Sequence, residues 1–386
     1  MSTSVRLRRP DGSTYVRELH DPPVWPQPTR PIASRVAYAA VPVMAAPAGA
    51  NALGATAELD WEATLAVRRE IWAYGLGVAE AMDTAQRGMG LDWATTEELI
   101  RRSSAEAAAV GGRIAAGAGT DHLSGAATVG EVVAGYEHQL EVVERAGARP
   151  ILMASRHLAA LARGPGDYAE VYGKLLAQVR RPAILHWLGA PFDPALAGYW
   201  GSADLDEASE AFLEIVNAHA DVVEGVKISL LDADREVALR ERLPAGVAMY
   251  TGDDFNYPTL IRGDQRSYSD ALLGIFAGIA PAASAALQAL DAGDVEGFDA
   301  AFAPTVPLAR HVFASPTYYY KTGLGFLAWL RGQQPGFTMV GGLQGGRSVP
   351  HLVRVLELAD EAGLLPDPEL AAARMGAFLD VAGVSR

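Results

Sequence analysis

The sequence contains no cysteine and only three lysines, Lys174, Lys227 and Lys321. The absence of cysteine excludes a disulfide framework, a thiolate nucleophile and a cysteine-ligated metal site. The scarcity of lysine is informative because the 32 basic residues are almost all arginine. Arginine stays cationic at any working pH, whereas a desolvated lysine can lose its proton and become an amine nucleophile toward a carbonyl carbon. Each lysine is therefore a candidate for a specific role.

Long apolar runs are also missing, since none approaches the roughly 20 residues that span a bilayer. The first ten residues carry arginines but lack the apolar stretch of a secretory signal. The formal net charge of −14 argues against a nucleic-acid-binding surface, and an anionic substrate would need a local arginine pocket. We therefore expect a cytoplasmic protein that acts on a small molecule, with no membrane and no nucleic-acid partner.

Short β-branched or alanine-rich runs alternate with segments of helical period over residues 36–280. This alternation is typical of repeated βα units, and eight strand candidates match the number that a closed barrel requires. The sequence predicts an α/β fold, a (β/α)8 TIM barrel, with an N-terminal arm over residues 1–35 and a C-terminal helical extension over residues 281–386. The predicted strands are Val36–Ala45, Leu76–Met82, Arg113–Gly117, Pro150–Ala154, Ala183–Trp187, Val222–Ile228, Val247–Tyr250 and Ala271–Phe276.

Lys227 lies near the carboxyl end of the predicted strand Val222–Ile228. The reactive groups of a (β/α)8 barrel gather at that end of its strands. Lys227 is therefore the first candidate for a buried amine nucleophile. A structural role is the alternative, because such a lysine can extend its ammonium to water or pair with a carboxylate such as Glu224.

Polar side chains also follow most of the other predicted strands, where they would contact a substrate or transfer protons. Several have a structural alternative: Asp83 and Asp253 suit helix caps, and His186 suits a hydrogen-bonded place in the core. The candidates are Asp83, Thr84, Arg87, Ser155, Arg156, His157, His186, Thr251, Gly252 and Asp253.

Taken in order, these segments resemble the dihydrodipicolinate synthase and N-acetylneuraminate lyase superfamily, the Schiff-base aldolases and lyases on a (β/α)8 barrel. Gly225, Lys227 and Ser229 match the pattern around the Schiff-base lysine. Asp83–Leu91 is similar to the second-strand loop, and Tyr250–Asp254 to the seventh strand. The resemblance extends over roughly residues 35 to 300 and implies that Lys227 forms an iminium with no cofactor and no metal.

The sequence departs from the superfamily's pattern at two places. The fourth strand of the superfamily normally ends in a proton-shuttling tyrosine, but the matching segment here is Met153–His157. The second-strand loop usually has two threonines that bind a carboxylate, and here Thr84 stands beside Asp83. The amine chemistry therefore carries over better than the proton relay or the specificity for pyruvate, as in a divergent branch.

The first hypothesis is a class I lyase or aldolase that acts on a small keto acid or a carbohydrate-derived keto compound. Lys227 would attack the ketone, and His186 and Asp83 would transfer protons, with His157 as a further choice for the missing tyrosine. The other candidates would bind the substrate in this hypothesis: Thr84, Arg87, Ser155, Arg156, His157, Thr251, Gly252 and Asp253.

Two alternatives remain open. One is a catalytically degenerate barrel that only binds its ligand. The other is a metal-dependent isomerase or aldolase, because Asp and His side chains at strand ends suit a divalent ion. Its ligands would come from Asp83, His122, His186, Asp253 and Asp254.

The expected partners are a small-molecule carbonyl substrate and further copies of the same chain, in a homo-oligomer of two or four subunits. This expectation rests on the resemblance. Lys321 lies in an aromatic-rich segment that we expect to be helical, and we expect it to pack there and carry a surface charge.

Overall fold

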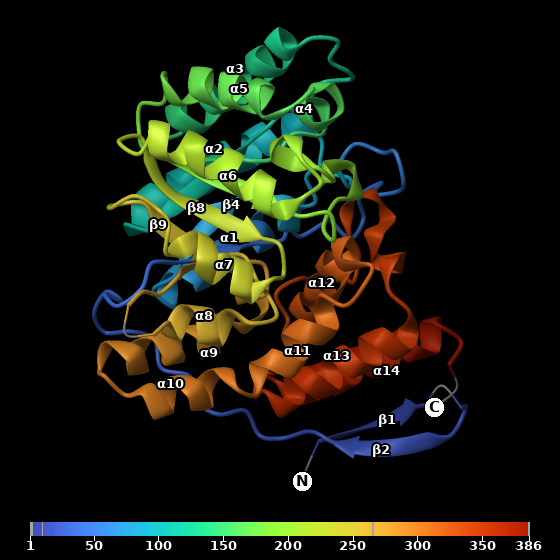
Figure 1. Cartoon of the computed structure of the whole chain (residues 1–386). Coiled ribbons are helices and arrows are strands. Elements are labelled where there is room, and N and C mark those ends of the chain that lie inside the picture. The colour runs from blue at the N-terminus through green and yellow to red at the C-terminus, as the bar shows by residue number, and fades with distance from the viewer. Residues whose placement is uncertain (1–2, 10, 265, 385–386) are drawn as a thin grey trace.

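Eight parallel strands form a closed barrel in the computed structural model, which describes residues 3–9, 11–264 and 266–384 (Figure 1). Neighbouring strands pair in the order β10-β3-β4-β5-β6-β7-β8-β9. The predicted (β/α)8 barrel is therefore confirmed, and each predicted strand has its counterpart. The strands are β3 Ala37–Ala40, β4 Gly77–Glu80, β5 Ile114–Ala118, β6 Arg149–Leu152, β7 Ala183–Leu188, β8 Val223–Ser229, β9 Ala248–Thr251 and β10 Asp270–Leu273.

Large and small side chains alternate inside the barrel and fill it. The rings of Tyr38 and Tyr250 meet edge to face at 6.0 Å between their centroids. Glycines on the neighbouring strands make room for them: a Cβ at Gly77 would lie 2.5 Å from Tyr38 Cδ1, and one at Gly225 would lie 2.6 Å from Tyr250 Cε2. The barrel interior is therefore a packed core, as in other barrels of this size.

Amphipathic helices cover the outside of the barrel (Figure 1). No helix among the described residues is both long enough and apolar enough to cross a membrane. These helices are α1 Trp61–Ala73, α2 Trp93–Val110, α3 Val129–Arg145, α4 Arg156–Leu161, α5 Pro165–Leu176, α6 Leu205–Ala218, α7 Ala233–Arg240, α8 Tyr257–Arg262 and α9 Phe276–Asp291. Short 3₁₀ turns interrupt the loops at Asp83–Ala85, Pro194–Leu196, Tyr199–Gly201, Thr317–Tyr319 and Val340–Gly346.

Five further helices follow α9 and gather on one side of the barrel (Figure 1). Helix α9 spans the predicted boundary between the barrel and the C-terminal extension, at residues 280 and 281, so a division there would cut one helix. We propose to place this boundary after Asp291. The segment from Phe313 to the start of α12 reaches the barrel. The helices are α10 Val295–Phe302, α11 Thr305–Val312, α12 Tyr320–Leu330, α13 Val349–Glu361 and α14 Pro368–Val381.

The N-terminal arm contains an antiparallel pair of strands that the sequence did not predict, β1 Ser4–Arg8 and β2 Thr14–Glu18. Each strand has only five residues, so the alternation of apolar and polar side chains is too short to predict a strand next to the proline-rich segment that follows. Figure 1 shows the pair next to α14. An ion pair between Arg17 Nη2 and Asp360 Oδ2, at 2.7 Å, joins the arm to α13.

Candidate active site

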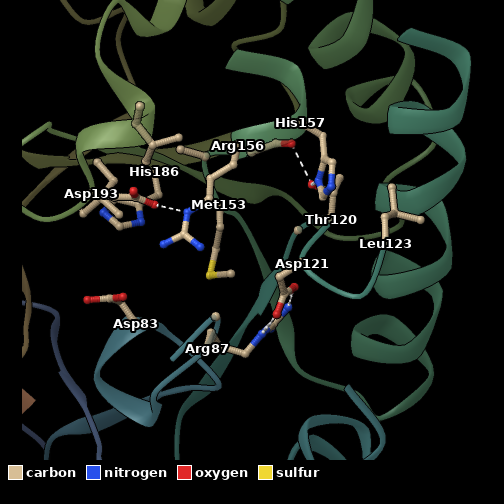
Figure 2. A pocket seen from close by; sticks show the side chains of 16 residues that line it. Asp83, Arg87, Thr120, Asp121, Leu123, Met153, Arg156, His157, His186 and Asp193 are labelled. Atoms are coloured by element: carbon tan, nitrogen blue, oxygen red, sulfur yellow. Dashed lines mark hydrogen bonds and ion pairs between the residues drawn. The ribbon is translucent and has the colours of Figure 1, made fainter. Parts of the chain in front are cut away.

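Two adjoining cavities lie at the carboxyl ends of the barrel strands. The outer cavity, seen in Figure 2, has a volume of about 380 Å³. The inner cavity surrounds Lys227 and holds only about 10 Å³. Asp83, His186 and Leu188 line both, so the two cavities meet at these side chains. The polar residues of the inner cavity are Asp83, Thr84, His186, Lys227, Ser229, Asp254 and Tyr320.

Lys227 projects from β8 into the inner cavity and is only 8% exposed. Its ammonium makes no ion pair or hydrogen bond with any other residue that the structure describes. Burial lowers the pKa of Lys227 to about 8, against the opposing effect of Asp254 and Asp83. Burial therefore makes the neutral amine far more accessible near neutral pH than it is in an exposed lysine, with roughly a tenth of the side chain neutral at pH 7.

Gly252, just after β9, provides the space that Lys227 occupies. A Cβ at Gly252 would lie 3.0 Å from Lys227 Cε and would collide with Ser229 Oγ. Glu224, at the other end of β8, pairs with Arg149 and accepts a hydrogen bond from Tyr250 Oη at 3.0 Å. The alternative pairing of Lys227 with Glu224 is therefore wrong.

Asp254 is the second buried carboxyl group of the inner cavity, and the sequence suggested it only as a metal ligand. Its Oδ1 accepts a hydrogen bond from the backbone N–H of Ile275 at 2.8 Å. Burial raises the pKa of Asp254 to about 7, although this hydrogen bond and Lys227 act in the opposite direction. Burial thus favours the neutral form of both Asp254 and Lys227, while the charge of each favours ionisation of the other.

Asp83 joins the barrel to the C-terminal helices. Its Oδ2 accepts a hydrogen bond from Tyr320 Oη at 3.0 Å, and its Oδ1 lies 3.1 Å from Lys321 Nζ. Tyr320 Oη also lies 2.8 Å from Thr84 Oγ1. The surface charge expected for Lys321 is therefore wrong, because the residue is fully buried and pairs with Asp83.

Tyr320 is the functional candidate that the sequence analysis missed. It is 3% exposed, and its ring stacks on Phe313 with 4.3 Å between the centroids. Burial and the nearby Asp83 raise the pKa of Tyr320 well above its usual value, so its hydroxyl stays protonated. The signal available in the sequence was the segment of three tyrosines before Lys321, but nothing local placed that segment at the barrel.

His186 lies on β7 and lines both cavities. Its Nε2 is 3.0 Å from Ser229 Oγ. Burial, together with Lys227, lowers the pKa of His186 well below its usual value. The imidazole is therefore neutral and faces the shared boundary of the cavities.

Arg87 lines the outer cavity, but its guanidinium is occupied (Figure 2). It forms a bidentate ion pair with Asp121 and donates to Gln139 Oε1 at 2.7 Å. It also donates to the carbonyl oxygens of Ala81 and Gly117, each at 3.2 Å. Because its five N–H groups have protein partners, we assign Arg87 to the cavity wall rather than to substrate contact.

The loop after β6 and the start of α4 supply three of the predicted residues to the outer cavity, Ser155, Arg156 and His157. Arg156 Nε pairs with Asp193 Oδ2 at 2.5 Å, and His157 Nδ1 is 3.1 Å from Thr120 Oγ1, as Figure 2 shows. Ser155 Oγ caps α4 by accepting from Leu158 N at 3.0 Å.

Thr251 and Asp253 line neither cavity. Thr251 Oγ1 donates to Glu236 at 2.9 Å, toward α7. Asp253 Oδ1 accepts from the backbone N–H groups of Phe255 and Asn256 at 2.8 and 3.0 Å, so it holds the turn before α8, whose N-cap is Asn256, and the predicted capping role is wrong. No three His, Cys, Asp or Glu side chains in the described parts of the chain are arranged to hold a metal ion. The metal-dependent alternative is therefore not favoured.

Known proteins resemble this chain in two ways. The family model described as "Protein of unknown function (DUF993)" matches residues 5–384. Dihydrodipicolinate synthase from Thermotoga maritima has a TM-score of 0.66 at 13% identity, over 86% of this chain and 99% of that one. Dihydrodipicolinate synthase from Aquifex aeolicus has a TM-score of 0.63 at 14% identity, over 86% of this chain and 99% of that one. A putative dihydrodipicolinate synthetase from Pseudomonas aeruginosa has a TM-score of 0.62 at 16% identity, over 85% of this chain and 99% of that one. The comparison with curated proteins gave no match. The predicted likeness to dihydrodipicolinate synthase is thus confirmed for the fold.

Proposed function

Because the chain belongs to the DUF993 family and has the fold of dihydrodipicolinate synthase, we propose that it is a class I lyase or aldolase. Its substrate is a small carbonyl compound that forms a Schiff base with Lys227. The environment of Lys227 carries this proposal. Its amine is buried, has no ion pair with a described residue, and has a pKa lowered to about 8. These properties suit an amine nucleophile at the end of the strands where barrel enzymes place their reactive groups.

The proposed reaction begins with attack of the neutral Lys227 amine on the substrate carbonyl carbon. Loss of water gives an iminium. When the bond between the α- and β-carbons of the substrate breaks, the iminium accepts the electron pair of that bond, and the far fragment leaves as a carbonyl compound after its hydroxyl group loses a proton. The resulting enamine takes up a proton, and water then hydrolyses the iminium, which releases the product and restores the amine. The same steps in reverse order form the bond.

Each step needs a proton donor or acceptor near the iminium, and the inner cavity contains several. We assign Tyr320 to the role that the missing fourth-strand tyrosine has in the superfamily pattern, because its hydroxyl lies between Thr84 and Asp83. Asp83 is the proposed base, and Asp254 controls the charge of Lys227. His186, at the boundary of the cavities, is the proposed contact for the part of the substrate that leaves.

Reductive trapping tests this function. Cyanoborohydride with a panel of ketones and aldehydes should add the mass of one substrate less one oxygen atom to the protein, because the adduct loses water and gains two hydrogens, and peptide mapping should place it on Lys227. The variant Lys227→Arg should give no adduct, since a guanidinium forms no iminium under these conditions. Lys174, which pairs with Glu170 on the surface, and the buried Lys321 are internal controls. An adduct on Lys321 alone, or none with any carbonyl compound, would rule the proposal out.

The cytoplasmic location and the oligomer of two or four subunits also remain proposals. Size-exclusion chromatography coupled to light scattering tests the oligomeric state. A monomer at micromolar concentration would contradict the proposed oligomer.

A further inference from the structure

Among the described residues, two carboxyl groups and one amine line the inner cavity. Its charged lining residues are Lys227, Asp83 and Asp254. Lys321 contributes a positive charge, but its ammonium contacts Asp83 at 3.1 Å and the sulfur of Met89 at 3.2 Å, and Lys321 lines neither cavity. In the described parts of the chain, Lys227 is therefore the cation that faces the inner cavity.

The cations of the outer cavity are already paired with carboxylates. Arg87 has protein partners for its five N–H groups, with Asp121 as its counter-ion. Arg156 pairs with Asp193 at 2.5 Å. Arg87 therefore has no N–H group left for an anionic substrate, whereas Arg156 is bound to Asp193 through Nε alone among the described residues and its Nη groups stay open to one.

These charges bear on what can reach Lys227. In an α-keto acid the carboxylate is bonded directly to the carbonyl carbon. When that carbon is within bonding distance of Lys227 Nζ, the carboxylate must lie in the inner cavity, near Asp83 and Asp254. A deprotonated carboxyl group there repels the substrate carboxylate, because buried groups are poorly screened by water, and Lys321 offsets only the charge of Asp83.

A hydroxymethyl group in the same place meets complementary partners. Its O–H can donate to a carboxylate oxygen of Asp83 or Asp254, and its oxygen can accept from Tyr320 or Thr84. The outer cavity continues this pattern with the uncharged hydroxyl groups of Thr120 and Ser155.

On the premise of the Schiff-base function above, we propose that the substrate is an α-hydroxy ketone or aldehyde of the polyhydroxylated kind with no carboxylate bonded to its carbonyl carbon, and that the inner cavity rejects α-keto acids. This inference rests on the two carboxyl groups that line the inner cavity and on Lys227 as the one cation among its described lining residues.

Hydroxyacetone and pyruvate make a matched pair of probes, because both have three carbons and a methyl ketone and differ in a hydroxymethyl against a carboxylate. Each is trapped on the full-length protein with cyanoborohydride, and the rate is divided by that of Nα-acetyl-lysine, which corrects for intrinsic reactivity. Hydroxyacetone should label Lys227 at least tenfold faster than pyruvate on this scale. Asp83→Asn, which removes one carboxylate and leaves Lys321 unpaired, should raise the pyruvate rate and narrow the difference.

The outcomes separate the two proposals. Labelling of Lys227 by pyruvate as fast as by hydroxyacetone would overturn the substrate class and leave the Schiff-base function standing. If neither compound labels Lys227, and longer hydroxy ketones and keto acids do not label it either, both the substrate class and the Schiff-base function are overturned. A preference for hydroxyacetone that stays unchanged in a folded Asp83→Asn variant would remove Asp83 as its cause and overturn the electrostatic argument.

Discussion

Two buried lysines at the mouth of the barrel differ in what surrounds their ammonium groups. Lys321, on α12, lies 3.1 Å from Asp83 Oδ1. Lys227, on β8, has no ion pair with any described residue, and burial lowers its pKa to about 8. Contact with a carboxylate holds a lysine in an ion pair, whereas burial without contact favours the neutral amine. Burial alone therefore does not favour the neutral amine, and the absence of a contacting carboxylate is what supports Lys227 rather than Lys321 as the proposed nucleophile.

The largest expected effect separates the two lysines by chemistry. Lys227→Arg should reduce solvent deuterium exchange at the α-carbon of hydroxyacetone by roughly 10³-fold or more, because no enamine forms without the amine. Proton NMR of hydroxyacetone in deuterated buffer measures this rate. Lys321→Arg serves as the matched control and should retain exchange, and an equal loss in both variants would mean that the comparison is wrong.

Removing the other lysine should act mainly on stability. Lys321→Met leaves the Asp83 carboxylate without its counter-ion at a largely buried site, and the free energy of unfolding should fall by about 3 kcal/mol. Urea titration followed by circular dichroism measures it. The double variant Lys321→Met/Asp83→Asn should recover part of the loss. No recovery would mean that packing of Lys321, rather than its charge, accounts for the effect.

Tyr320 should affect proton transfer rather than amine attack. Tyr320→Phe removes the hydroxyl between Thr84 and Asp83 but keeps the ring that stacks on Phe313. We expect deuterium exchange to fall about 10²-fold, a typical contribution of one acid or base, while the trapped adduct still forms on Lys227. If adduct yield and exchange fell together, Tyr320 would be a structural support of the cavity.

The smallest expected effect is a shift in pH dependence. The neutral amine attacks, so the trapping rate should rise about tenfold per pH unit below about pH 8 and level off above it. Asp254 raises the pKa of Lys227 by its charge, so Asp254→Asn should move the midpoint to lower pH, by about one unit. A midpoint above pH 10, as for an exposed lysine, would contradict the assigned environment of Lys227.

The fold and part of the site could be predicted from the sequence because their signals are local. The alternation of strand-like and helical segments leads to one closed barrel. The strand-end rule places Asp83, His186 and Lys227 together, since the carboxyl ends of all eight strands meet at one mouth. The same rule misplaced Thr251, because successive side chains on a strand point to opposite faces: Tyr250 points inward, so Thr251 points toward α7.

The sequence by itself determined the barrel, the scarcity of lysine and the place of Lys227 at a strand end. The tertiary structure decided which lysine lacks a partner, which guanidinium groups are occupied, and that Tyr320 reaches Thr84 across 236 residues of sequence. The physical reason is range. Backbone periodicity acts over a few residues, whereas a counter-ion or a hydroxyl partner is chosen by packing between elements that are remote in the chain.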